Sequence, residues 1–205
     1  MTRDKRMGFN DVLEFWFTPH DEEGTSSKEC AQRWYQKSDD FDATIRERFL
    51  DIYEQLAAGE TPDGWDDSPK ARLARVIVLD QFTRNMFRGS GRMYASDDVA
   101  LALSRSLVAD LPTLGTHFAT FALMPLMHAE DLAAQEDCVR IFAELAENEE
   151  RSAAARAVFS NSRDYAVSHR DVVARFGRFP HRNALLSRDN TAEEDVYLQD
   201  PKAGW

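Results

Sequence analysis

Apolar residues recur at intervals of three and four along almost the whole chain, and this periodicity constrains the fold more than any other feature. Such spacing places apolar side chains on one face of an α-helix. Runs in which apolar and polar residues alternate, rich in Val, Ile and Thr, are missing from the sequence. The sequence therefore predicts an all-α fold without a substantial sheet.

Residues that start and stop helices divide this pattern into about eight to ten helices. Proline at the first helical position loses no hydrogen bond, so Ser68-Pro69 predicts a helix that reaches about residue 88. Pro125 should kink or divide a helical stretch over residues 118–142. Helix starts are expected at Asn10, Ser26 with Glu29, Ser96, Ser152, and Thr191 with Glu194, and helix ends at Gly59 and Gly177. A seam, meaning a break between two helices, is expected near Asn161 or Ser162. The short connections favour antiparallel helical hairpins in a bundle or stack.

Composition and charge narrow the class of protein. At 205 residues, with 43% hydrophobic and 30% charged residues, the chain fits one domain over residues 1–205, with mobile ends at residues 1–8 and 201–205. Its net charge of -11 repels nucleic acid and anionic membranes, so neither is an expected partner. The longest nearly apolar stretch, residues 118–127, is about half a membrane span, and a cytoplasmic location is expected. Cys30 and Cys138 form no metal or disulfide motif and should be small core residues.

Polar residues occupy core positions in the helix predicted over residues 69–88. Asp80 and Arg84 lie one turn apart on its apolar stripe, and Gln81 and Asn85 repeat that spacing one position further on. A buried ion pair with an amide network would explain these residues structurally. A carboxylate and a guanidinium that line a pocket would explain them functionally, and the spacing leaves both open.

A second interruption follows Pro125. His128, Asp131 and Gln135 share one stripe with Met124, Val139 and other apolar residues. Three polar groups on a buried face must meet partners on another helix, in water or in a ligand, because an unpaired buried polar group is costly. The pattern is compatible with a satisfied core and with a site.

The third interruption lies near the C-terminal end. His169 sits within an apolar stripe, and Arg178, His181 and Asn183 follow in a loop dense in hydrogen-bond donors. Between residues 163 and 188 six arginines accompany two aspartates, which makes this stretch basic in an acidic protein. Guanidinium groups match carboxylate and phosphate geometry, so an anion site is one interpretation. The other is that these arginines cap helices and pair with acidic neighbours.

Familiar catalytic motifs are missing. The sequence contains no HExxH, no GxxxxGK[ST], no GxGxxG and no nucleophile elbow, which disfavours zinc-protease, P-loop, Rossmann and serine-hydrolase chemistry. A metal site would have to be assembled from distant histidines with Asp80 or Asp131, and neither a metal nor a cofactor is predicted. Acid–base chemistry remains. Its candidate catalytic residues are His128, His169, His181, Asp80 and Asp131, and its candidate ligand-binding residues are Gln81, Arg84, Asn85, Gln135, Arg178 and Asn183.

Four strings give the chain a family resemblance. They are VLEFWF at residues 12–17, LDQFTRNMFRG at 79–89, MPLMHAEDL at 124–132, and HRD to RFGRFPHRN at 169–183. In this order they resemble the bacterial domain-of-unknown-function family numbered 924, over about residues 12–198. Thr83 and Ala129 depart from the family pattern, where proline and serine stand, and neither change removes a charged or imidazole group. The resemblance implies a helical, tetratricopeptide-like fold and no known activity.

The resemblance singles out nearly the same residues as the periodicity, with Glu130 as an addition. Two hypotheses follow. In the first, a polar pocket binds a small anionic ligand and acts on it by acid–base chemistry. In the second, a concave tetratricopeptide-like surface binds a peptide or protein without catalysis, an analogy drawn from fold alone.

Overall fold

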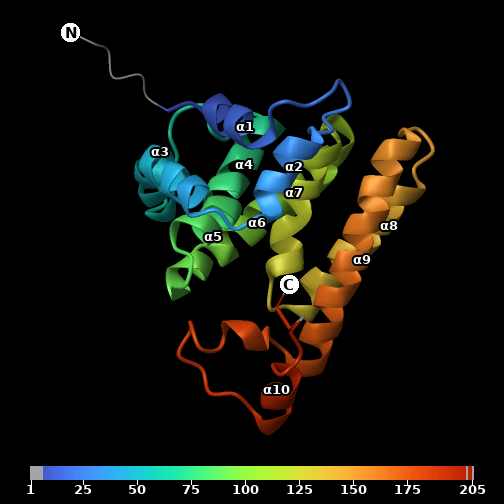
Figure 1. The fold of residues 1–205 in the computed structure, drawn as a ribbon. Helices are drawn as coiled ribbons and strands as arrows, with labels where there is room; N and C mark the ends of the chain where they lie inside the picture. The colour runs from blue at the N-terminus through green and yellow to red at the C-terminus, as the bar shows by residue number, and fades with distance from the viewer. Residues whose placement is uncertain (1–6, 202, 205) are drawn as a thin grey trace.

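The computed structural model describes residues 7–201, 203 and 204, and their secondary structure is helical, as predicted (Figure 1). The α-helices are α1 (Phe9–Phe17), α2 (Lys28–Tyr35), α3 (Asp39–Ala57), α4 (Pro69–Val76), α5 (Thr83–Met86), α6 (Asp97–Leu107), α7 (Thr116–His128), α8 (Leu132–Glu147), α9 (Ala153–Phe176) and α10 (Ala192–Tyr197). A π-helix, Ile77–Phe82, joins α4 to α5, and short 3₁₀ helices occupy Gly91–Tyr94, Val108–Thr113 and Pro180–Arg182. Among the described residues, the β-structure consists of one isolated antiparallel bridge between His20 and Ser26.

The helices form a body and a hairpin (Figure 1). Helices α1 to α7 pack around an aromatic core, in which the rings of Trp16, Phe49 and Phe82 lie 4.5–5.4 Å from their neighbours. Each fully buried side chain of this size contributes roughly 1.5–3 kcal/mol. Helices α8 and α9 form a long antiparallel pair beside α7, and the segment after α9 crosses the foot of the molecule with α10.

Local capping chemistry accounts for most of the helix ends. Ser68, Ser152 and Gly177 start or stop helices as predicted. Thr191 and Glu194 form the predicted capping box. Two predicted starts are wrong by one or two residues: Ser27, not Ser26, caps α2, and Gly8, not Asn10, precedes α1. The predicted seam in α9 is also wrong, since that helix is continuous over 24 residues.

Pro125 was predicted to kink or divide its helix, and it does not divide it. Helix α7 continues through it to His128, and the break comes at residues 129–131, where Asp131 caps α8. Helix α7 is bonded to its neighbour α6 close to the proline, where Ser104 Oγ donates to the carbonyl of Ala122 at 2.6 Å. Pro125 removes the helical bond to the carbonyl of Phe121, and the helix continues for three residues beyond it.

The sequence also led to expectations for the two ends of the chain and for its two cysteines. Residues 1–6, 202 and 205, on which part of the predicted mobile ends falls, lie outside the described residues. Met7 packs against the core. Cys30 and Cys138 are buried free thiols, as expected. Over the described part of the chain, no helix has both the length and the apolar character needed to cross a membrane.

Candidate functional site

The π-helix places Asp80 at the centre of the molecule. Within Ile77–Phe82 every residue but Gln81 is buried, and the Asp80 carboxylate has no exposed surface. Two residues of the same helical segment hold it: Gln81 Nε2 donates to Oδ2 at 2.6 Å, and an Arg84 nitrogen lies 3.3 Å from Oδ1. A π-turn is rare and is often found at functional sites, because it re-aims a side chain that an α-helix would point elsewhere.

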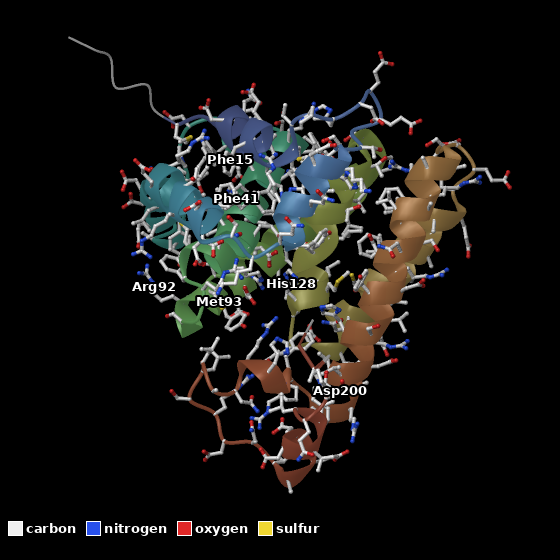
Figure 2. All side chains as sticks on the ribbon, viewed as in Figure 1. Phe15, Phe41, Arg92, Met93, His128 and Asp200 are labelled. Carbon is white, nitrogen blue, oxygen red and sulfur yellow. The ribbon has the colours of Figure 1, made fainter. Side chains whose placement is uncertain are left out.

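His128 is the last residue of α7, and it faces Asp80. Its Nδ1 lies 2.8 Å and 3.0 Å from the two carboxylate oxygens. A carboxylate can only accept, so Nδ1 carries the proton and Nε2 carries the lone pair of the neutral ring. Figure 2 shows His128 at the lower end of α7, above the C-terminal segment. Within the described residues Nε2 has no hydrogen-bond partner.

Two arginines and a second carboxylate surround this pair. Arg84 donates to both oxygens of Asp97 at 3.1 Å, and Arg182 donates to Asp97 at 3.2 Å and to the carbonyl of His128 at 2.9 Å. The Tyr94 ring packs under the two guanidinium groups at 5.8 Å and 4.5 Å. We call Asp80, Arg84, Asp97, His128 and Arg182 the α7 cluster. Two carboxylates balance two guanidinium groups within it.

Electrostatics fix the charge of Asp80. Burial alone would raise the pKa of this carboxyl, but the charge of Arg84 and the interactions with His128 and Gln81 outweigh it and hold the pKa well below its usual range. The carboxylate is therefore ionised at neutral pH. Burial, only partly offset by Arg84, raises the pKa of Asp97.

One side of His128 borders a cavity of about 450 Å³. Its described lining comes from α2, α7 and α9 and consists of Tyr35, Met124, Met127, His128, Asn161, Ser162, Tyr165 and His169. The rings of His128 and His169 lie 6.4 Å apart. His169 Nδ1 bonds the Tyr165 carbonyl at 2.8 Å, and burial lowers the pKa of His169 to about 3, so this ring is neutral at neutral pH.

Three of the predicted site residues form hydrogen bonds at helix ends or between neighbouring helices. Asn85 donates to Asp42 at 2.7 Å. Gln135 donates to the carbonyls of Met127 and Ala129 at 2.6 Å and 2.8 Å, across the α7–α8 break. Asp131 caps α8 and pairs with Arg105 at 3.1 Å. None of the three belongs to the described lining of the cavity.

The predicted basic loop forms a separate set of ion pairs. Arg178 makes two bonds to Glu194, at 2.7 Å and 2.8 Å, and Arg188 makes two to Glu130, at 2.6 Å and 2.8 Å. Asn183 donates to Asn190 at 2.8 Å and accepts from Arg188 at 2.9 Å. We call Glu130, Arg178, Asn183, Arg188 and Glu194 the C-terminal cluster. It ties the segment after α9 to the rest of the molecule.

His181 lies between the two clusters. Its ring is 5.6 Å from that of Phe179, and burial, followed by the charge of Arg182, lowers its pKa to about 4. The structure thus brings Asp80, Gln81 and Arg84 together beside His128, and it places His128 and His169 in the lining of the cavity. It places Arg178 and Asn183 elsewhere.

Asp97, Arg182, Tyr35 and Tyr165 were not among the site residues predicted from the sequence. Asp97 looked like a first-turn residue suited to a helix dipole, and Arg182 was one arginine among many. Tyr35 and Tyr165 looked like ordinary helix residues. Spacing along one helix cannot show such pairings, because Asp97 and Arg182 lie 85 positions apart. Among the described residues, no group of three or more His, Cys, Asp or Glu side chains is arranged to hold a metal ion.

The fold and this geometry define an all-α protein in which a buried Asp–His pair borders a cavity. A family model, described as "Bacterial protein of unknown function (DUF924)", matches residues 12–202, and the chain belongs to this family, as its motifs indicated. The chain is similar to a solved structure, the protein of unknown function ATU0120 from Agrobacterium tumefaciens, with 32% identity and a TM-score of 0.76. The match covers 94% of this chain and 97% of the other. None of the curated proteins matches.

Proposed function

We propose that this protein binds a small organic molecule in the cavity between α2, α7 and α9, and that His128 exchanges a proton with it. The observation that carries the proposal is the position of His128 between the fully buried Asp80 and the cavity. Since Asp80 holds Nδ1, the Nε2 edge is the part of the ring that can serve a ligand. The volume of about 450 Å³ lies within the range of small-molecule sites.

The roles within the pair follow from their chemistry. An ionised Asp80 fixes the tautomer and orientation of the His128 ring and stabilises the imidazolium that forms when Nε2 takes a proton. Gln81 and Arg84 hold the carboxylate in place. His169 contributes a neutral ring at the same cavity. A positioned base of this kind accelerates proton transfer by typically 10²–10⁴-fold.

The peptide-binding alternative has less support. Five large apolar or aromatic side chains are exposed among the described residues: Tyr35, Val99, Leu132, Tyr165 and Val196. Of these, Tyr35 and Tyr165 lie at one place, and that place is the cavity. A peptide groove would present a continuous apolar patch of several hundred Å².

A proton-abstraction probe tests the base directly. In 5-nitrobenzisoxazole, a base removes the ring C–H proton, the electron pair breaks the N–O bond, and a coloured cyanophenolate forms. We expect the protein to exceed free 4-methylimidazole, mole for mole, by at least about tenfold.

Variants assign that activity to one ring. His128→Ala should remove it, and added imidazole should restore part of it by filling the vacated space. His20→Asn is the matched control, because His20 is an exposed histidine bonded to the neighbouring Asp21. The proposal is overturned if the wild-type rate equals that of free 4-methylimidazole, or if His128→Ala retains the wild-type rate.

A further inference from the structure

The described lining of the cavity carries no Asp, Glu, Lys or Arg side chain. Its polar atoms belong to two histidines, two tyrosines, Asn161 and Ser162. A carboxylate or phosphate group held in such a lining would lose its hydration without a fixed cation in exchange, and that loss is costly. The described part of the lining thus favours a ligand without charge.

The arginines nearest the cavity are engaged behind it. Arg84 bonds Asp97 through two nitrogens and also lies 3.3 Å from Asp80. Arg182 is divided between Asp97 and the His128 carbonyl. To hold an anion, either guanidinium would have to abandon a buried carboxylate, which would then be unpaired.

Two further observations agree. Burial keeps His169 neutral, since its pKa is lowered to about 3. The net charge of -11 produces a field that repels anions approaching from solvent.

Aromatic rings at the cavity indicate the shape of the ligand. Tyr35 on α2 is 72% exposed and Tyr165 on α9 is 53% exposed, although both belong to the described lining. Desolvation, followed by the charge of Tyr165, raises the pKa of Tyr35. Met124 and Met127 add thioether groups, which make favourable contacts with aromatic rings.

We propose that the cavity binds an uncharged, planar aromatic molecule, whose ring packs against Tyr35 and Tyr165 and whose polar group meets His128. The inference rests on the proposed function and names its class of ligand. It replaces the anionic ligand expected from the sequence, because the arginines of that expectation are paired with carboxylates.

Matched neutral and anionic fragments test the charge. Benzamide and benzoate have nearly the same shape, and two-dimensional NMR of the histidine rings detects even millimolar binding. At pH 7 we expect benzamide to shift the His128 resonances and to bind at least about tenfold more tightly than benzoate. Cyclohexanecarboxamide, which is neutral but not planar, should bind more weakly than benzamide.

Tyrosine variants test the aromatic contact. Tyr35→Leu and Tyr165→Leu should each weaken benzamide about threefold to tenfold, the range of an aromatic pair, and leave cyclohexanecarboxamide nearly unchanged. Tyr197→Leu, which alters a tyrosine packed on Phe176 away from the cavity, is the control.

The outcomes separate this inference from the proposed function. If benzoate shifts His128 and binds as tightly as benzamide or more tightly, the neutral ligand is overturned while the site stands. If benzamide binds equally well to Tyr35→Leu, Tyr165→Leu and wild type, the aromatic contact is overturned. If no fragment shifts His128, both the site and this inference fail.

Discussion

The two clusters of charged side chains look alike in the sequence and differ in the structure. Both contain arginines paired with carboxylates, and side chains of both are largely buried. In the C-terminal cluster the charged groups pair with one another and hold a segment in place. In the α7 cluster the charged groups surround one ring, His128, which borders a cavity. Polar residues at core positions therefore indicate pairing, and only the adjoining cavity distinguishes a candidate site from a structural contact.

The largest expected effect comes from removing the carboxylate at the centre of the α7 cluster. Asp80→Ala should lower the free energy of unfolding by about 3–5 kcal/mol, because it leaves His128 Nδ1 and part of Arg84 without their buried partner. Denaturant titration measures the change.

Two control variants are compared with Asp80→Ala. Asp80→Asn keeps the shape of the side chain and should cost less. Asp164→Ala removes an exposed carboxylate paired with Arg163 and should stay within about 0.5 kcal/mol. A loss for Asp80→Ala no greater than that for Asp164→Ala would show that the α7 cluster contributes little to stability.

The next effect is a dependence of stability on pH. Burial lowers the pKa of folded His169 from 6.5 to about 3, so between these values the unfolded chain takes up a proton that the folded chain does not. The contribution of His169 to the free energy of unfolding is thus fully present above pH 6.5, and it is lost as the pH decreases towards 3. Between pH 7 and pH 5 this site should account for a loss of about 2 kcal/mol.

A variant isolates the contribution of that histidine. His181 and His117 also have lowered pKa values and act with the same sign, so the wild-type slope is their joint effect. His169→Gln should reduce the slope of unfolding free energy against pH over this range. An unchanged slope would show that His169 protonates equally in the folded and unfolded chains.

A smaller effect is expected in the C-terminal cluster. Arg178→Ala should lower the free energy of unfolding by less than Asp80→Ala does, since it leaves the buried Glu194 carboxylate with fewer donors. The rate with 5-nitrobenzisoxazole should stay at the wild-type level. If the variant instead keeps its stability and loses fragment binding, the two clusters exchange the roles assigned to them here.

The sequence predicted the helices well where their ends are set by local chemistry. Ser68, Ser152 and Gly177 act through bonds to residues within four positions, so they can be identified without knowledge of the fold. The π-helix at Asp80 and the continuous passage of α7 through Pro125 depend on packing against other helices, which no local pattern contains.

The candidate site shows the same limit. Asp80 and His128 were identified because each interrupts an apolar stripe on its own helix, whereas their contact spans 48 positions. The cavity requires α2, α7 and α9 together. Periodicity finds residues that need a partner, and the tertiary fold decides whether that partner is a side chain or a ligand.

The smallest effect concerns the end of the chain, next to His181. Gly204 has φ +100°, and a Cβ placed there would approach His181 Cβ and Cγ at 2.8 Å. Gly204→Ala should therefore displace this contact by a local shift of the backbone, which limits the loss of unfolding free energy. The His181 ring resonances should shift in two-dimensional NMR while those of His128 stay in place, because His128 is held by Asp80. If His128 moves with His181, the chain end acts on the cavity as well as on the C-terminal segment.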